Sequence, residues 1–165
     1  MIGLPADSRP IRCHGTPPPK FLYFRGAIGL TRVFVNRNAI IIVDDDAIVA
    51  LRNHELLTKS GYVVPRMFAS GEDLLDYLDG SAPPDLILMD VGLDGRIDGI
   101  ETARRVRKRS AVPFIFLSSV DDDRRTERAQ EVPDSVYMVK PVIESRLMEA
   151  IGSILGRTGA GGRDR

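Results

Sequence analysis

The chain has 165 residues, which is about the length of one ordinary domain. Its 23 Lys and Arg residues balance 23 Asp and Glu residues, and 43% of its residues are hydrophobic, which is typical of a globular protein. This composition excludes a multidomain machine, a collagen, a coiled coil and a wholly disordered chain. The single Cys13 excludes an internal disulfide, and one cysteine with two histidines cannot form the usual structural zinc site, so we expect the reducing cytoplasm as the compartment.

The charge is divided unevenly along the chain. Residues 1–37 carry six basic residues and one acidic residue, a net charge of +5, and residues 157–165 carry +2. The remaining body, residues 38–156, therefore has a net charge of −7. Binding to nucleic acid phosphates requires clustered Lys and Arg, so this acidic body predicts no nucleic acid partner.

The two ends of the chain differ in composition from the body. Residues 1–37 contain five of the 11 prolines and show no sustained helical or strand period, which predicts a mostly disordered, basic, proline-rich extension. Residues 21–35 are apolar, but Arg25 and Arg32 interrupt them, so no membrane or export segment is expected. The glycine-rich residues 157–165 predict a flexible tail, which leaves residues 38–156 as the one folded domain.

The body alternates between short apolar runs and longer mixed segments, a pattern that indicates alternating strands and helices. The first half predicts a buried strand over 39–43, a helix over 47–60, a weaker edge strand over 62–68 that contains Pro65, and a helix over 70–79. The second half predicts strands over 86–89, 114–117 and 136–139, with helices over 99–109 and 122–131. The last helix is expected to bury one face, formed by Ile143, Leu147, Ile151 and Ile154.

Five such pairs with right-handed crossovers predict a doubly wound α/β domain with a parallel sheet. Ligands bind such sheets at the carboxyl ends of the strands. Every informative strand end is polar here, since the strands are followed or ended by Asp44, Asp45, Asp46, Asp90, Ser118, Ser119 and Lys140. We therefore expect the functional site at this edge of the sheet.

The acidic strand ends indicate a metal-assisted chemistry. Carboxylates that meet in one place repel each other unless a cation binds between them, and all-oxygen ligands suit Mg²⁺. A bound Mg²⁺, the ammonium of Lys140 and a serine hydroxyl around one carboxylate would provide the electrostatic environment that phosphoryl transfer requires. A carboxylate can then serve as the phosphoryl acceptor.

Four separated motifs strengthen this interpretation, namely IIIVDDD at 40–46, LILMDVGLDGRIDGIE at 86–101, PFIFLSS at 113–119 and YMVKP at 137–141. In order and spacing they resemble the receiver domains of two-component response regulators, over residues 39–155. The resemblance implies a flavodoxin-like (βα)5 fold, a three-layer sandwich around a five-stranded parallel sheet. It also implies a protein that catalyses only its own phosphorylation and dephosphorylation.

The resemblance assigns a role to each candidate residue. Asp90 would be the phosphoacceptor, and Asp44, Asp45, Asp90 and the carbonyl of Gly92 would hold Mg²⁺. Ser118 and Lys140 would contact the phosphoryl group, Tyr137 would be the aromatic switch, and a cis bond would join Lys140 to Pro141. The implied donor is a sensor histidine kinase or a histidine phosphotransfer protein. Because the chain ends soon after the last expected helix, we expect a stand-alone receiver with no membrane partner.

The same residues allow other interpretations. Asp46 fits an ordinary helix cap. His54 and Glu55 resemble the His-Glu box of sensor histidine kinases, but the proline usual in that box is missing, so we interpret His54 as a surface residue. A phosphatase of the haloacid dehalogenase type would use Asp44 as its nucleophile, although it would leave Asp90 without a role. A receiver-like module that binds partners without phosphorylation is a third possibility.

Overall fold

The computed structural model describes residues 21–26, 29–34, 38–119 and 123–160, and it divides the chain into two units, residues 1–36 and 37–165. In the first unit, β1 (Phe21–Gly26) pairs with β2 (Gly29–Phe34) in an antiparallel hairpin. The lack of a strand period over residues 1–37 predicted no strand here. Aromatic and β-branched residues in both segments favour strands, and the other residues of the predicted extension lie outside the described part of the chain.

The second unit is built on a five-stranded parallel sheet with the order β4-β3-β5-β6-β7. This confirms the predicted doubly wound α/β fold. The strands are β3 (Ile40–Val43), β4 (Met67–Phe68), β5 (Leu86–Asp90), β6 (Phe114–Ser118) and β7 (Ser135–Val139). The order reverses between β3 and β5, which is where this class of fold binds its ligands.

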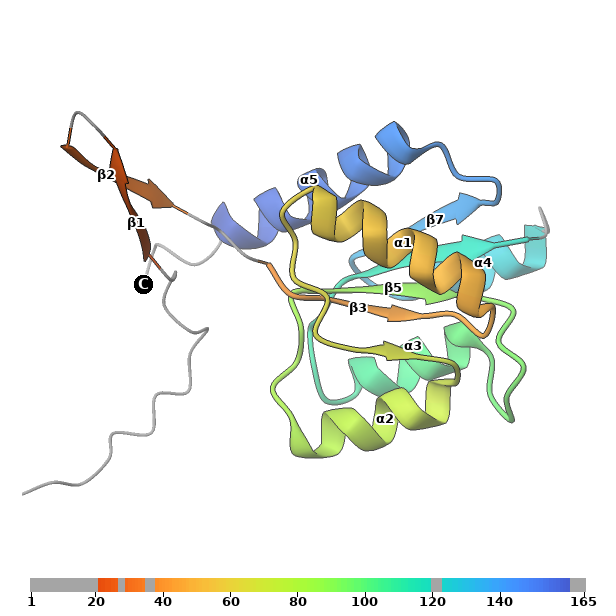
Figure 1. The fold of residues 1–165 in the computed structure, drawn as a ribbon. Coiled ribbons are helices and arrows are strands. Elements are labelled where there is room, and N and C mark those ends of the chain that lie inside the picture. Colours follow the sequence, from red (N-terminus) through yellow and green to blue (C-terminus); the bar gives the residue numbers. More distant parts are fainter. Residues whose placement is uncertain (1–20, 27–28, 35–37, 120–122, 161–165) are drawn as a thin grey trace, which may run out of the picture. The chain divides into compact units, whose positions relative to one another are not determined.

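Helices cover both faces of this sheet, with α1 and α5 on one face and α2 and α3 on the other (Figure 1). Their bounds are α1 (Ala47–Lys59), α2 (Gly71–Gly80), α3 (Gly99–Arg107), α4 (Asp123–Gln130) and α5 (Glu144–Ala160). Alternate strand residues face opposite layers. Ile40 and Ile42 therefore pack in the apolar cluster that includes Leu57 of α1, whereas Ile41 and Val43 pack in the cluster that includes Ile100 of α3.

Three side chains fix where the helices near the strand ends begin. The backbone N–H groups of Ile48 and Val49 donate to Asp46 Oδ1, so Asp46 is the predicted cap of α1. Ser70 caps α2 and Asp98 caps α3 in the same way. In the described part of the chain, no helix is long and apolar enough to cross a membrane.

Two local predictions were wrong. The expected strand over 62–68 is reduced to Met67–Phe68 and an isolated bridge between Ala39 and Val63. The N–H groups of Ile40 and Ile42 donate to the carbonyls of residues 63 and 66, so one extra residue interrupts the pairing beside Pro65, which has no N–H to donate. Ile143 is 59% exposed and lies before α5, which begins at Glu144, whereas Leu147, Ile151 and Ile154 are buried as predicted.

Gly99 lies directly behind the end of β5, and its lack of a side chain sets how closely α3 approaches Asp90. A Cβ atom at Gly99 would overlap the carbonyl oxygen of Asp90 and lie 2.9 Å from Met89 Cγ. Gly99→Ala is therefore expected to lower the free energy of unfolding by about 1–3 kcal/mol, measured by urea denaturation. The matched control is Gly152→Ala in α5, where a Cβ meets nothing within 4 Å and a small gain is expected. Equal stabilities of the two variants would contradict this account.

Candidate functional site

The sheet brings the predicted acidic residues together at the point where the strand order reverses. Asp44 follows β3, Asp90 ends the neighbouring strand β5, and a carboxylate oxygen from each lies within 4.8 Å of one from Asp45. Asp44 and Asp90 are buried, and Asp45 is exposed. Three carboxylates this close would repel each other strongly in the absence of a neighbouring cation.

Lys140, which follows β7, supplies one positive charge to this cluster. Its Nζ lies 3.1 Å from Asp44 Oδ2 and 2.8 Å from Asp90 Oδ1, and its backbone N–H donates to the Ser118 carbonyl at 2.7 Å. Burial alone would lower the pKa of Lys140, but the nearby carboxylates of Asp90 and Asp44 outweigh burial and raise it. The bond to Pro141 is cis, as predicted.

The surroundings of Asp44 disfavour the ionised form of its carboxyl group. Burial raises the pKa of Asp44 above its ordinary value, and the neighbouring Asp90 acts in the same direction. The ammonium of Lys140 and the backbone N–H of Asp46 lower the pKa without cancelling the effect of burial. Ionisation of the Asp44 carboxyl group is therefore less favourable in the folded protein than in the unfolded chain.

Asp90 has one oxygen that accepts a hydrogen bond and one that does not. Gly92 N–H donates to Asp90 Oδ2 at 3.1 Å. Asp90 Oδ1 is buried and forms an ion pair with Lys140 Nζ at 2.8 Å, but it accepts no hydrogen bond in the described part of the chain. An oxygen with this environment, beside two further carboxylates, fits a hard divalent cation as its partner.

These groups open into a pocket of about 420 Å³ that is lined by Asp44, Asp45, Asp46, Val49, Asp90, Gly92, Ser119 and Lys140. The pocket thus includes all the predicted metal and acceptor residues and Lys140. Ser118, the predicted hydroxyl, is fully buried at the end of β6 and is not among the lining residues, whereas its neighbour Ser119 is. The sequence places two serines at the end of this strand, and nothing in it indicates whether Ser118 or Ser119 faces the pocket.

Tyr137 lies away from the carboxylates, on β7. It pairs with Phe116 across the strands and is half-buried against the apolar cluster that includes Phe116 and Met89. It does not line the acidic pocket.

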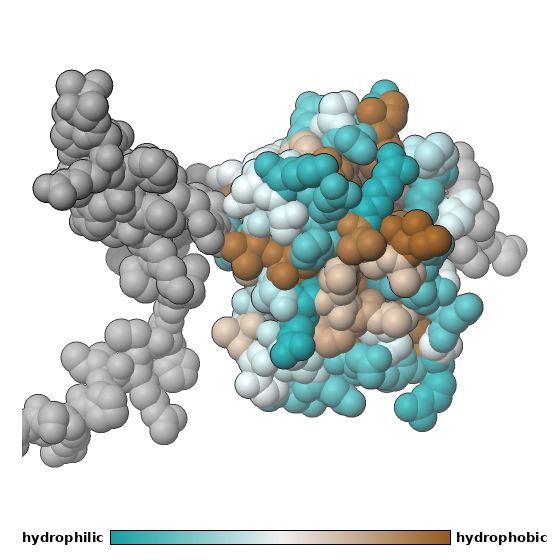
Figure 2. Space-filling model, viewed as in Figure 1, coloured by the Kyte–Doolittle hydropathy of each residue, from teal (hydrophilic) through white to brown (hydrophobic). Residues whose placement is uncertain are grey.

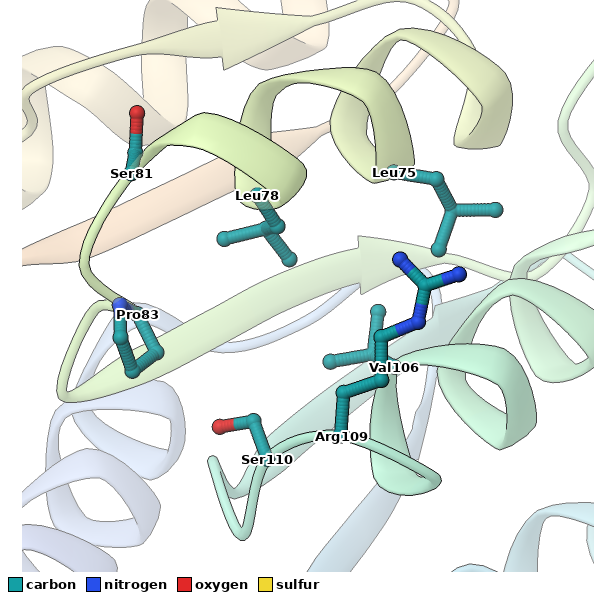
Figure 3. A pocket seen from close by; sticks show the side chains of 7 residues that line it. All are labelled: Leu75, Leu78, Ser81, Pro83, Val106, Arg109 and Ser110. Atoms are coloured by element: carbon teal, nitrogen blue, oxygen red, sulfur yellow. The ribbon is translucent and has the colours of Figure 1, made fainter.

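A second hollow lies between α2 and α3 and has a volume of about 210 Å³. Figure 3 shows Leu78 and Val106 pointing into it and the long side chain of Arg109 crossing its mouth. Arg109 forms an ion pair with Asp79. None of the predicted site residues lines this hollow, so the acidic pocket is the candidate functional site.

The comparisons with known proteins agree with this geometry. Residues 40–152 match the family model described as the response regulator receiver domain. The chain is 37% identical over 120 residues to the transcriptional regulatory protein AfsQ1 of Streptomyces coelicolor, and this match covers 72% of the chain and 52% of that protein. The chain spans about half the length of the curated relatives it matches.

Solved structures show the same fold. A putative response regulator from Chloroflexus aurantiacus is 32% identical, with a TM-score of 0.67, and the match covers 74% of this chain and all of that one. A CheY-like receiver domain protein from Methanospirillum hungatei has a TM-score of 0.70 at 23% identity, covering 77% of this chain and 100% of that one. The second likeness supports the fold alone.

The raised pKa of Asp44 generates a prediction about stability and pH. At neutral pH and without Mg²⁺, Asp44→Asn is expected to raise the free energy of unfolding, because it removes a buried charge that the fold disfavours. The difference in free energy of unfolding between Asp44→Asn and the wild type should shrink as the pH falls toward 3.8, since the folded wild-type protein then carries a neutral Asp44. Urea unfolding at several pH values measures this. An advantage that grows on acidification would contradict it.

Proposed function

Because the chain belongs to the response regulator receiver domain family, we propose that Asp90 accepts a phosphoryl group from a phosphohistidine of a partner protein. The observation that carries this proposal is the meeting of Asp44, Asp45, Asp90 and Lys140 in one pocket. Family membership and the position of Asp90 favour it over a phosphatase that uses Asp44 as its nucleophile. They also favour it over a module that works without phosphorylation.

Mg²⁺ is the proposed cofactor, held by Asp44, Asp45, Asp90 and the carbonyl of Gly92. The three carboxylates and Lys140 together carry a net charge of −2, which one divalent cation would neutralise. When bound, Mg²⁺ would offset the negative charge of the incoming phosphoryl oxygens.

The residues of this chain act on the phosphoryl group by position and charge. In the proposed step, a carboxylate oxygen of Asp90 forms a bond to phosphorus while the bond to the donor imidazole nitrogen breaks and its electron pair stays on that nitrogen. Lys140, already beside Asp90, then pairs with a phosphoryl oxygen. In hydrolysis, a water oxygen forms a bond to phosphorus while the bond between phosphorus and the Asp90 oxygen breaks, which releases inorganic phosphate and restores the Asp90 carboxylate. The chain would thus catalyse only its own phosphorylation and dephosphorylation.

The proposed response to phosphorylation runs through Ser118 and Tyr137. Ser118 lies two residues after Phe116 on β6, and Tyr137 pairs with Phe116, so both side chains are on the α3 and α4 side of the sheet. We expect the Ser118 hydroxyl to move toward the phosphoryl group and Tyr137 to turn inward. The surface formed by α4, β7 and α5 would then switch between two states and bind a target protein.

The surface beside the pocket supports a protein as donor. Ile48 and Leu51 on α1 are 80% and 61% exposed, and Ile48 lies two residues after Asp46 of the pocket. Figure 2 shows that apolar surface is present on the face that carries α1, interrupted by polar side chains. Exposed apolar groups of this kind next to a reactive site suit a partner such as a sensor histidine kinase or a histidine phosphotransfer protein.

The absence of a nucleic acid partner remains a prediction for the body. The basic residues of α3 support it, because Arg104, Arg105 and Arg107 form ion pairs with Glu131, Glu101 and Asp134. Paired guanidinium groups are less available to phosphates.

The proposed chemistry is tested by incubating the purified protein with acetyl phosphate and Mg²⁺. Mass spectrometry is expected to show one acid-stable, base-labile phosphoryl group on the wild-type protein and none on Asp90→Asn. If both proteins carry the label, or neither does, the assignment of Asp90 is wrong. A label that maps to Asp44 would favour the phosphatase.

The proposed switch is tested by comparing two neighbouring serines. Ser118→Ala is expected to leave labelling of Asp90 in place but to abolish the change that phosphorylation causes in the NMR signals of the Tyr137 ring. Ser119→Ala, which alters the pocket wall and not the buried hydroxyl, is the control and should retain that change. Loss of the response in Ser119→Ala alone would assign the switching hydroxyl to Ser119.

A further inference from the structure

The loop between β5 and α3, residues 91–98, carries Gly92 of the proposed Mg²⁺ site. It is glycine-rich, and Gly92, Asp94, Gly95 and Arg96 are all exposed. The buried side chain of Leu93 anchors the first half of the loop, and Asp98, the cap of α3, fixes the end of the loop. A loop of this composition has many accessible backbone conformations, so its middle requires a further contact to keep one shape.

Glu72, in the first turn of α2, makes that contact. The backbone N–H of Arg96 donates to Glu72 Oε1 at 3.0 Å. Glu72 Oε2 faces Gly95, where a Cβ atom would lie only 2.9 Å from this oxygen. Both carboxylate oxygens of Glu72 are therefore directed at the middle of the loop.

The guanidinium of Arg96 contributes little to this contact. Its Nε lies 3.6 Å from Glu72 Oε1, and the Arg96 side chain is 91% exposed, whereas that of Glu72 is 26% exposed. Exposed ion pairs of this length add little stability. The hydrogen bond to the backbone is thus the contact that fixes the loop.

Glu72 has a feature that stability alone does not explain. Its Oε2 is buried and has no hydrogen-bond partner in the described part of the chain. Burying an unpaired carboxylate oxygen is unfavourable, so a residue chosen for stability alone would not leave this oxygen there. Residues that break a stability rule beside a site are expected to serve that site.

We propose that Glu72 is a positioning residue for the Mg²⁺ site, holding the backbone at Gly95 and Arg96 so that Gly92 stays against Asp90. This inference rests on the proposed function, since Gly92 matters only if its carbonyl binds the cation. Glu72 does not touch the carboxylate cluster and acts through the loop, as outer partners of metal ligands do.

The test is a titration of the ¹⁵N-labelled full-length protein with MgCl₂, followed by amide chemical shifts. Glu72→Ala is expected to weaken Mg²⁺ binding about tenfold, while its urea unfolding midpoint does not fall. Glu72→Gln keeps an acceptor for the Arg96 N–H and should restore binding. Arg96→Ala, which keeps the backbone N–H, is the matched control and should bind Mg²⁺ as the wild type does.

Gly95→Ala provides an independent route if Glu72→Ala fails to fold. The added Cβ would press on Glu72 Oε2 and displace it from the loop, so Gly95→Ala should weaken Mg²⁺ binding. Wild-type affinity in a folded Gly95→Ala protein would count against the proposal. Wild-type affinity in Glu72→Ala, or losses in Glu72→Gln or Arg96→Ala equal to that of Glu72→Ala, would overturn the proposal. A wild-type protein that shows no response to MgCl₂ would instead refute the proposed function.

Discussion

One lysine between two buried carboxylates is the interaction on which the site depends. Lys140 Nζ lies 3.1 Å from Asp44 Oδ2 and 2.8 Å from Asp90 Oδ1, although the three residues are far apart in the sequence. A parallel sheet makes this meeting possible, because β3, β5 and β7 all end at the same edge. The single ammonium does not balance three carboxylates, and the remaining negative charge is what makes the pocket suited to a dication.

The rest of the domain holds the site by apolar packing behind it and by both an ion pair and apolar packing at α4. The carbonyl of Asp90 lies against Gly99, and apolar clusters fill both faces of the sheet, so β5 cannot move easily. By contrast, α4 is joined to α3 by the ion pair of Arg128 with Asp98, whose side chains are 41% and 35% exposed. Partly exposed ion pairs of this kind are weak, and α4 is anchored instead by Ala129, which is fully buried in the apolar cluster that includes Phe116.

The sequence predicted most of the fold and of the acidic cluster because both follow from local patterns. Apolar runs such as residues 40–43 and 86–89 are the buried strands, and the acids after them fall at one edge once a parallel sheet is assumed. The hairpin of β1 and β2, the interruption near Pro65 and the exposure of Ile143 were not predicted. Strand pairing, and the exposure of residues at the ends of helices and strands, depend on which other segments pack nearby. The spacing of apolar residues within one segment does not specify those neighbours.

The roles of Glu72 and Asp98 illustrate what lies beyond such patterns. In the sequence, Glu72 is an ordinary acid in the first turn of a helix and Asp98 is an ordinary helix cap, two positions where the helix dipole favours a negative charge. In the folded chain Glu72 binds the middle of the loop that follows Asp90, and Asp98 at its end binds both the start of α3 and Arg128 of α4. The loop therefore contacts α2 through Glu72, and α3 and α4 through Asp98, while Gly92 at its start donates to Asp90.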